Sequence, residues 1–97
     1  MTFAIVLATA GDAGHATALG LAAQRAGHEV SLFLMDDGVA ALGAPELATL
    51  VDEGAEVVAC ATSLTLRALE APAGVVAGSQ DDHARLVSRA DRVVAFT

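Results

Sequence analysis

The chain has 97 residues, and 55% of them are hydrophobic but only 3% are aromatic. This length predicts one domain, residues 1–97, whose core is built mainly from Ala, Val and Leu. A formal net charge of -7 disfavours nucleic acid and anionic membranes as partners, and no apolar run reaches the roughly 20 residues that span a bilayer.

Apolar segments and helical segments alternate along the chain. Phe3–Ala8 is apolar without polar alternation, which is typical of a parallel strand covered on both faces. Strands are expected at 3–8, 30–35, 55–60, 75–77 and 92–96, and helices at 15–26, 45–53, 64–69 and 80–90. This order predicts an α/β fold, a three-layer α/β/α sandwich of flavodoxin-like architecture around a mainly parallel five-stranded sheet.

Turn and cap residues mark the expected ends of the helices. Gly27 and Gly54 are placed to end the first two helices in the left-handed conformation. Thr62 or Ser63 is expected to cap the short third helix, and Ser79-Gln80-Asp81-Asp82 resembles a capping box before the last one. Asp36-Asp37-Gly38 is expected to be a turn after the second strand, followed by one helical turn over 39–42.

Ligands of open parallel sheets bind where the strands end, so the loop after the first strand is one candidate site. Gly11, Gly14 and His15 could approach an anion, with His15 orienting it or donating a proton. The loop lacks the third glycine of a dinucleotide fingerprint and the ending of a P-loop, which favours a simple tight turn. His28 and His83 are expected to be solvated.

Cys60 is the most informative residue, because it is the only thiol and stands at the end of a strand before a helix. A helix N-terminus lowers a thiol pKa, and Arg67 could assist if the loop folds back. The alternative is a small buried hydrophobic residue. A single cysteine permits no internal disulfide, and no cluster has zinc spacing, so we expect a cytoplasmic protein without a metal.

Several stretches resemble the DsrE/DsrF-like family of small α/β proteins in bacterial sulfur relay, which includes subunits of the Tus tRNA-thiolation relay. The resemblance rests on residues 26–39 and 50–57, on Cys60 with Arg67 downstream, and on residues 90–96. It implies that Cys60 carries sulfane sulfur as a persulfide, with the amides of Ala61, Thr62 and Ser63 and the Arg67 side chain holding the anion. It also implies sulfur donor and acceptor proteins and a homo- or hetero-oligomer, such as a trimer or hexamer, and of these we expect a homo-oligomer, which suits a small domain with a lean core.

Two positions depart from the pattern of this family. Ser63 stands where some relatives have a second cysteine, so only a single-thiol mechanism is open to this chain. Ala68 stands where relatives often have glycine.

Two further functions compete with a sulfur carrier. One is a non-catalytic oligomeric module that binds a small anion through Gly11–His15 and Gly78-Ser79, with Cys60 only packing. The other, a flavin-binding protein, is disfavoured because no aromatic residue lies in the loops to stack on the ring. We therefore expect no cofactor.

Overall fold

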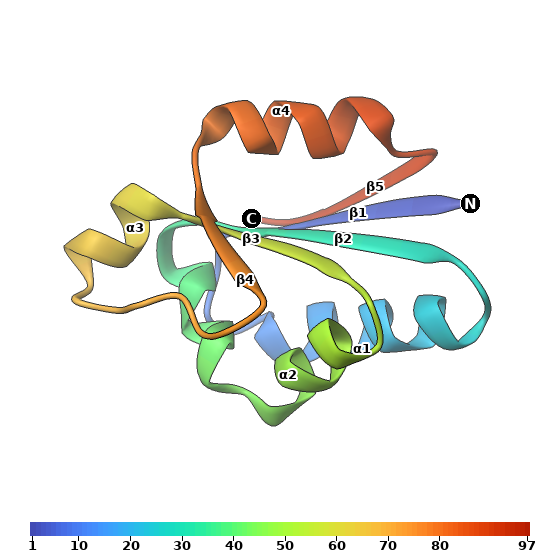
Figure 1. Ribbon diagram of the computed structural model, residues 1–97, viewed down its shortest axis with the longest axis horizontal. Coiled ribbons are helices and arrows are strands. Elements are labelled where there is room, and N and C mark those ends of the chain that lie inside the picture. The colour runs from blue at the N-terminus through green and yellow to red at the C-terminus, as the bar shows by residue number, and fades with distance from the viewer.

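The structure is a computed structural model that describes residues 1–97, and it consists of a sheet with helices on both faces (Figure 1). In chain order the elements are β1 Thr2–Leu7, α1 Ala13–Arg25, β2 Glu29–Leu34, the 3-10 helix η1 Asp36–Gly43, α2 Pro45–Asp52, β3 Glu56–Cys60, α3 Ala61–Leu66, β4 Val75–Gly78, α4 Gln80–Arg89 and β5 Arg92–Phe96. The predicted α/β sandwich is confirmed, and each predicted strand is present within two residues of its expected ends.

All strand pairs of the sheet are parallel, in the order β4-β3-β2-β1-β5. The chain steps in one direction from β1 to β4 and then crosses back to place β5 beside β1. Right-handed crossovers put α1 and α2 on one face of the sheet, and the reversed step puts α4 on the other (Figure 1). The strands end together at one end of the sheet, called here the carboxyl end, and begin at the amino end.

The core is unequal on the two faces of the sheet. On the face of α1 and α2, 15 buried residues form one cluster that includes Ile5, Leu32 and Leu50. On the face of α4 the buried cluster has four residues, Phe33, Val58, Cys60 and Leu86. Only one helix covers this second face, so Val76 of β4 and Val93 of β5 remain 56% and 45% exposed.

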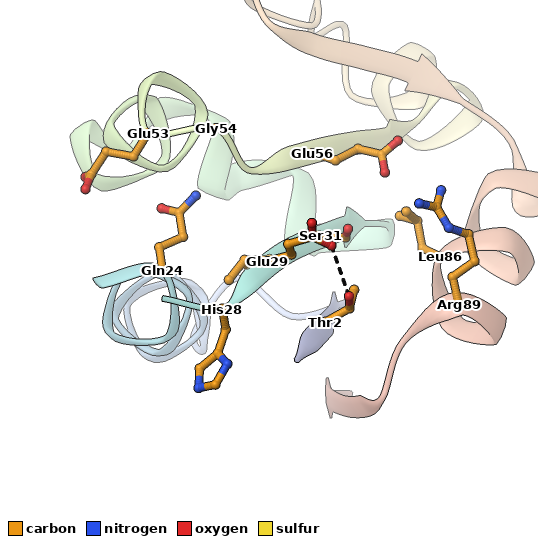
Figure 2. A pocket seen from close by; sticks show the side chains of 11 residues that line it. Thr2, Gln24, His28, Glu29, Ser31, Glu53, Gly54, Glu56, Leu86 and Arg89 are labelled. Carbon is orange, nitrogen blue, oxygen red and sulfur yellow. Dashed lines mark hydrogen bonds between the residues drawn. The ribbon is translucent and has the colours of Figure 1, made fainter. Parts of the chain in front are cut away.

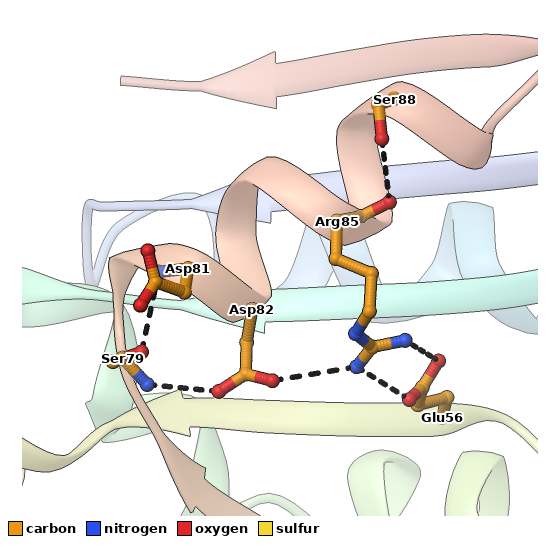
Figure 3. Close-up of polar contacts among 6 residues, drawn as sticks. All are labelled: Glu56, Ser79, Asp81, Asp82, Arg85 and Ser88. Carbon is orange, nitrogen blue, oxygen red and sulfur yellow. Dashed lines mark hydrogen bonds and ion pairs between the residues drawn. The ribbon is translucent and has the colours of Figure 1, made fainter.

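Polar contacts fix the first two turns of α4: a capping box at the start of the helix and an ion pair one turn later (Figure 3). The predicted capping box is confirmed, because the Ser79 hydroxyl accepts from the Asp81 amide while Asp82 accepts from the Ser79 amide. Arg85 donates to Glu56 at the start of β3, with 2.9 Å between Nη2 and Oε2. His83, expected from the sequence to be solvated, is only partly exposed, because its ring stacks on Phe33 with centroids 4.8 Å apart.

The helix ends follow the sequence signals except at α3. Gly27 and Gly54 end their helices with φ values of 92° and 102°, as predicted. Helix α3 begins at Ala61 with Cys60 as its N-cap residue, so the prediction of Thr62 or Ser63 as the cap is wrong. The Ser63 side chain is buried against η1 and is used there as a hydrogen-bond acceptor. None of the helices is long and apolar enough to cross a membrane.

Ala68 follows α3 in the left-handed region, with a φ of 52°. A Cβ in this conformation costs about 1–2 kcal/mol, partly offset by the greater freedom of an unfolded glycine. Ala68→Gly is therefore expected to stabilise the protein by about 0.5–1 kcal/mol, which thermal and urea unfolding would measure. Ala73→Gly, in the same loop but without positive φ, is the control and should be neutral or destabilising. A less stable Ala68→Gly protein would contradict the prediction.

Candidate functional site

Cys60 is the last residue of β3 and the residue that precedes α3, at the carboxyl end of the sheet. The residue is 9% exposed, and its side chain packs with Phe33, Val58 and Leu86 on the face that α4 covers. The thiol is therefore mostly enclosed between the sheet and a helix.

Opposing effects set the pKa of the Cys60 thiol. Burial raises this pKa because it disfavours the charged form, but hydrogen bonds from the Ser63 hydroxyl and from the Ser63 and Thr62 amides lower it. The Asp36 carboxylate raises it by charge repulsion. The hydrogen bonds prevail, and the pKa of Cys60 lies below its ordinary value. The thiolate is thus more populated near neutral pH than in an unfolded chain.

Ser63 is held in place for this role by the backbone of η1. It is 5% exposed, and its Oγ accepts a hydrogen bond from the Asp36 amide at 2.9 Å. Because this bond occupies an oxygen lone pair, the hydroxyl hydrogen remains free to point to the Cys60 sulfur. Asp36 adopts a φ of 50° at this contact, a conformation that few residues other than Gly, Asn and Asp tolerate.

Arg67 lies on the same side of the molecule but is bound to other groups. Its Nη2 donates to Asp37 Oδ1 at 2.8 Å, and its Nη1 donates to the Ser63 carbonyl at 3.3 Å. The Arg67 side chain is about one-third exposed. It thus ties the end of α3 to η1, and its expected action on a Cys60 anion stays a prediction.

The loop after β1 forms a separate group at the carboxyl end. Asp12 accepts a hydrogen bond from Thr9 at 2.7 Å, and the exposed His15 contacts Asp12 at 3.5 Å. These contacts with Thr9 and His15 lower the pKa of Asp12. Gly11 and Gly14 have open space where a Cβ would be. Strand β2 lies between β1 and β3, so the structure does not join this loop to Cys60.

A cavity of about 310 Å³ opens at the amino end of the sheet, far from the strand ends (Figure 2). Glu29 and Ser31 of β2 lie in its middle, between Glu53 on one side and Arg89 on the other. Sequence reasoning missed this cavity because its lining comes from separate elements whose first or last residues meet only in the fold. No three His, Cys, Asp or Glu side chains of the chain come together to hold a metal ion.

Comparisons with known proteins agree with this architecture. The model of the DsrE/DsrF-like family matches residues 1–96. The crystal structure of the YchN protein from E. coli is similar with a TM-score of 0.74 and 24% identity, over 99% of this chain and 100% of that chain. At this identity the likeness shows the fold. A search of curated proteins finds no match. Because the family model covers nearly the whole chain, the protein belongs to the DsrE/DsrF-like family.

Proposed function

We propose that this protein is a sulfur carrier that holds sulfane sulfur as a persulfide on Cys60. The observation that carries the proposal is the thiol itself, which is the only one in the chain and has a lowered pKa at the carboxyl end of a DsrE-type sheet. The Ser63 hydroxyl and the amides of Ser63 and Thr62 are the groups that lower the pKa of the thiol, so the same donors are at hand for a persulfide anion.

The chemistry needs no oxidant, reductant or cofactor. The Cys60 thiolate attacks the outer sulfur of a donor persulfide, R–S–SH, and the donor sulfur–sulfur bond breaks as the new one forms. The donor leaves as the thiolate R–S⁻ with the bonding electron pair, and Cys60 becomes Cys–S–SH. In the second step an acceptor thiolate attacks the outer sulfur, and the Cys60 thiolate leaves.

Incubation with a small persulfide donor tests the proposal. Mass spectrometry is expected to show one added sulfur atom on the native protein, removed by cyanide or a thiol, and none on Cys60→Ser. Thr62→Ala is the matched control, because it changes the neighbouring side chain but keeps the amide that donates to the sulfur. A native protein that takes up no more sulfur than Cys60→Ser would disprove the proposal.

The proposed carrier acts in the cytoplasm as a homo-oligomer, a trimer or a hexamer, and exchanges sulfur with donor and acceptor proteins. The face of the sheet that α4 covers supports self-association, because α4 leaves part of it open. Val76 and Val93 lie exposed there on the two edge strands. Exposed apolar side chains on both edge strands of the sheet are suited to contacts between copies of the chain. Light scattering of the native protein would give the number of subunits.

The enclosure of Cys60 favours a second candidate function. Its 9% exposure and its packing against Phe33 and Val58 are also what a structural cysteine shows. In that case the protein is a non-catalytic module that binds a small anion at Gly11, Gly14 and His15. A ligand that raises the melting temperature of wild type and Cys60→Ser equally, together with an inert thiol, would favour this function.

A further inference from the structure

We propose that the surface around Cys60 is a docking surface for a positively charged protein. The inference rests on the proposed function, because a sulfur carrier must bring its cysteine against the cysteine of a second protein. It adds the chemical character of that partner, which the charges and exposed side chains around Cys60 indicate.

Aspartates from two elements flank Cys60 and form what we call the acidic rim: Asp36, Asp37, Asp81 and Asp82. Asp36 and Asp37 lie beside Cys60 through the contacts of η1 with Ser63 and Arg67. Asp81 and Asp82 begin α4 directly after β4, whose Gly78 is in register with Cys60. Asp36, Asp37 and Asp81 are exposed.

Most positive charges of the molecule are at the other end. Three of its five basic residues lie at the amino end of the sheet: Arg25 ends α1, Arg89 ends α4 and Arg92 begins β5. Arg85, in the middle of α4, pairs with Glu56 at that end and also reaches Asp82 of the acidic rim at 3.5 Å. These arginines lie among a similar number of carboxylates there. Arg67, which lies near Cys60, already pairs with Asp37, so Asp36 and Asp81 are the rim carboxylates without an ion pair. The carboxyl end of the sheet, where Cys60 lies, therefore carries most of the net charge of -7.

Exposed leucines lie beside the acidic rim. Leu66, the last residue of α3, is 77% exposed, and Leu69 is 42% exposed. Figure 1 shows α3 and the segment after it projecting past the ends of the strands. Apolar side chains next to a single-sign charged surface are typical of a protein interface, where charge steers the encounter and apolar contact retains the partner.

Other occupants fit these observations less well. The acidic side chains are spread over two elements, and no three of them converge to hold a metal ion. Anionic lipid surfaces and nucleic acids would be repelled by the rim. A basic protein matches the charge, the extent of the rim and the two leucines.

Two matched peptides test the inference on the native protein. Both carry one cysteine activated as a mixed disulfide with thionitrobenzoate, with four lysines around it in one peptide and four glutamates in the other. The Cys60 thiolate attacks the peptide sulfur, the disulfide breaks, and the coloured thionitrobenzoate anion leaves. The rate of Cys60 with each peptide is divided by the rate at which N-acetylcysteine amide, an uncharged thiol compound, attacks the same peptide. Intrinsic differences in reactivity between the two peptides then cancel.

The lysine peptide is expected to react at least about tenfold faster than the glutamate peptide at low salt. The preference should vanish near 0.5 M salt, where the screening length is about 4 Å. The triple variant Asp36→Asn, Asp37→Asn, Asp81→Asn should lose most of it. The control Glu29→Gln, Asp52→Asn, Glu53→Gln makes the same change in charge at the amino end and should retain it. Equal rates for the two peptides in native protein would overturn the inference while leaving the carrier function intact.

A thiol that reacts with neither peptide would instead disprove the proposed function. The docking surface is then judged by NMR, with a lysine peptide that has serine in place of cysteine. Salt-sensitive shifts of the amides of 36–37, 66–69 and 79–82 would support the surface, and their absence would overturn it.

Discussion

Replacing Gly38 with alanine is expected to destabilise the protein by about 3 kcal/mol or more. Gly38 is buried in η1, and a Cβ built on it collides with the carbonyl oxygen of Leu7, at the end of the interior strand β1. The Ala8 nitrogen would lie 3.1 Å from the same Cβ. These are backbone atoms within hydrogen-bonded structure, so neither side can move away cheaply.

Urea and thermal unfolding would measure the effect, which corresponds to a fall in melting temperature of roughly 12 °C or more. Gly43→Ala is the matched control, because Gly43 ends the same 3-10 helix and has open space where the Cβ would be. It should change stability by no more than about 0.5–1 kcal/mol, and in the stabilising direction. A Gly38→Ala protein as stable as Gly43→Ala would show that η1 does not press on β1 as described.

Replacing Ser63 with alanine is expected to slow alkylation of Cys60 at neutral pH by about threefold to tenfold, which corresponds to the ~0.7–1.4 kcal/mol of one typical hydrogen bond. The reason is that the Ser63 hydroxyl lowers the pKa of Cys60. Without it the pKa rises, the thiolate is less populated at a given pH, and the pH profile of the reaction moves to higher pH. The change also leaves the Asp36 amide without its acceptor, which costs about 1–3 kcal/mol of stability.

The rate of iodoacetamide alkylation as a function of pH measures the change in the pKa of Cys60 apart from the change in stability. Wild type should react with a midpoint below that of the urea-unfolded chain, and Ser63→Ala with a midpoint between the two. Thr62→Ala should keep the wild-type midpoint, because Thr62 acts on the sulfur through its amide. Cys60→Ser serves as the blank. A Ser63→Ala midpoint equal to that of wild type would show that the Ser63 hydroxyl does not lower the pKa of Cys60.

The sequence was sufficient for elements whose signals are local. An uninterrupted apolar run identifies β1, Gly27 and Gly54 end α1 and α2 with positive φ, and the Ser79–Asp82 box begins α4. The start of α3 could not be predicted in the same way. Ser63 is a good capping residue by itself, but the Asp36 amide, 27 positions earlier, binds its hydroxyl instead. A tertiary contact thus overrides a local preference.

The candidate site shows the same division. Cys60 was found from its place at the end of a strand, and the structure puts it there. Its surroundings depend on contacts between distant elements: the hydrogen bond from Asp36 to Ser63, the ion pair of Arg67 with Asp37, and the stacking of His83 on Phe33. No spacing in the sequence announces these pairs, because each joins residues about 30 or 50 positions apart.

The placement of α4 and β5 has a consequence for how the protein assembles and opens. Strand β5 pairs only with β1, almost 90 positions earlier, whereas β1 to β4 each pair with a strand close in sequence. Contacts that close such long loops form late in folding, and units held by them open first by sub-global fluctuation. Helix α4 belongs to this unit and covers the cluster that encloses Cys60. Transient detachment of α4 and β5 would therefore bare the thiol without unfolding the four-stranded remainder, so that the population of this open form would scale the rate at which every reactant reaches the buried cysteine.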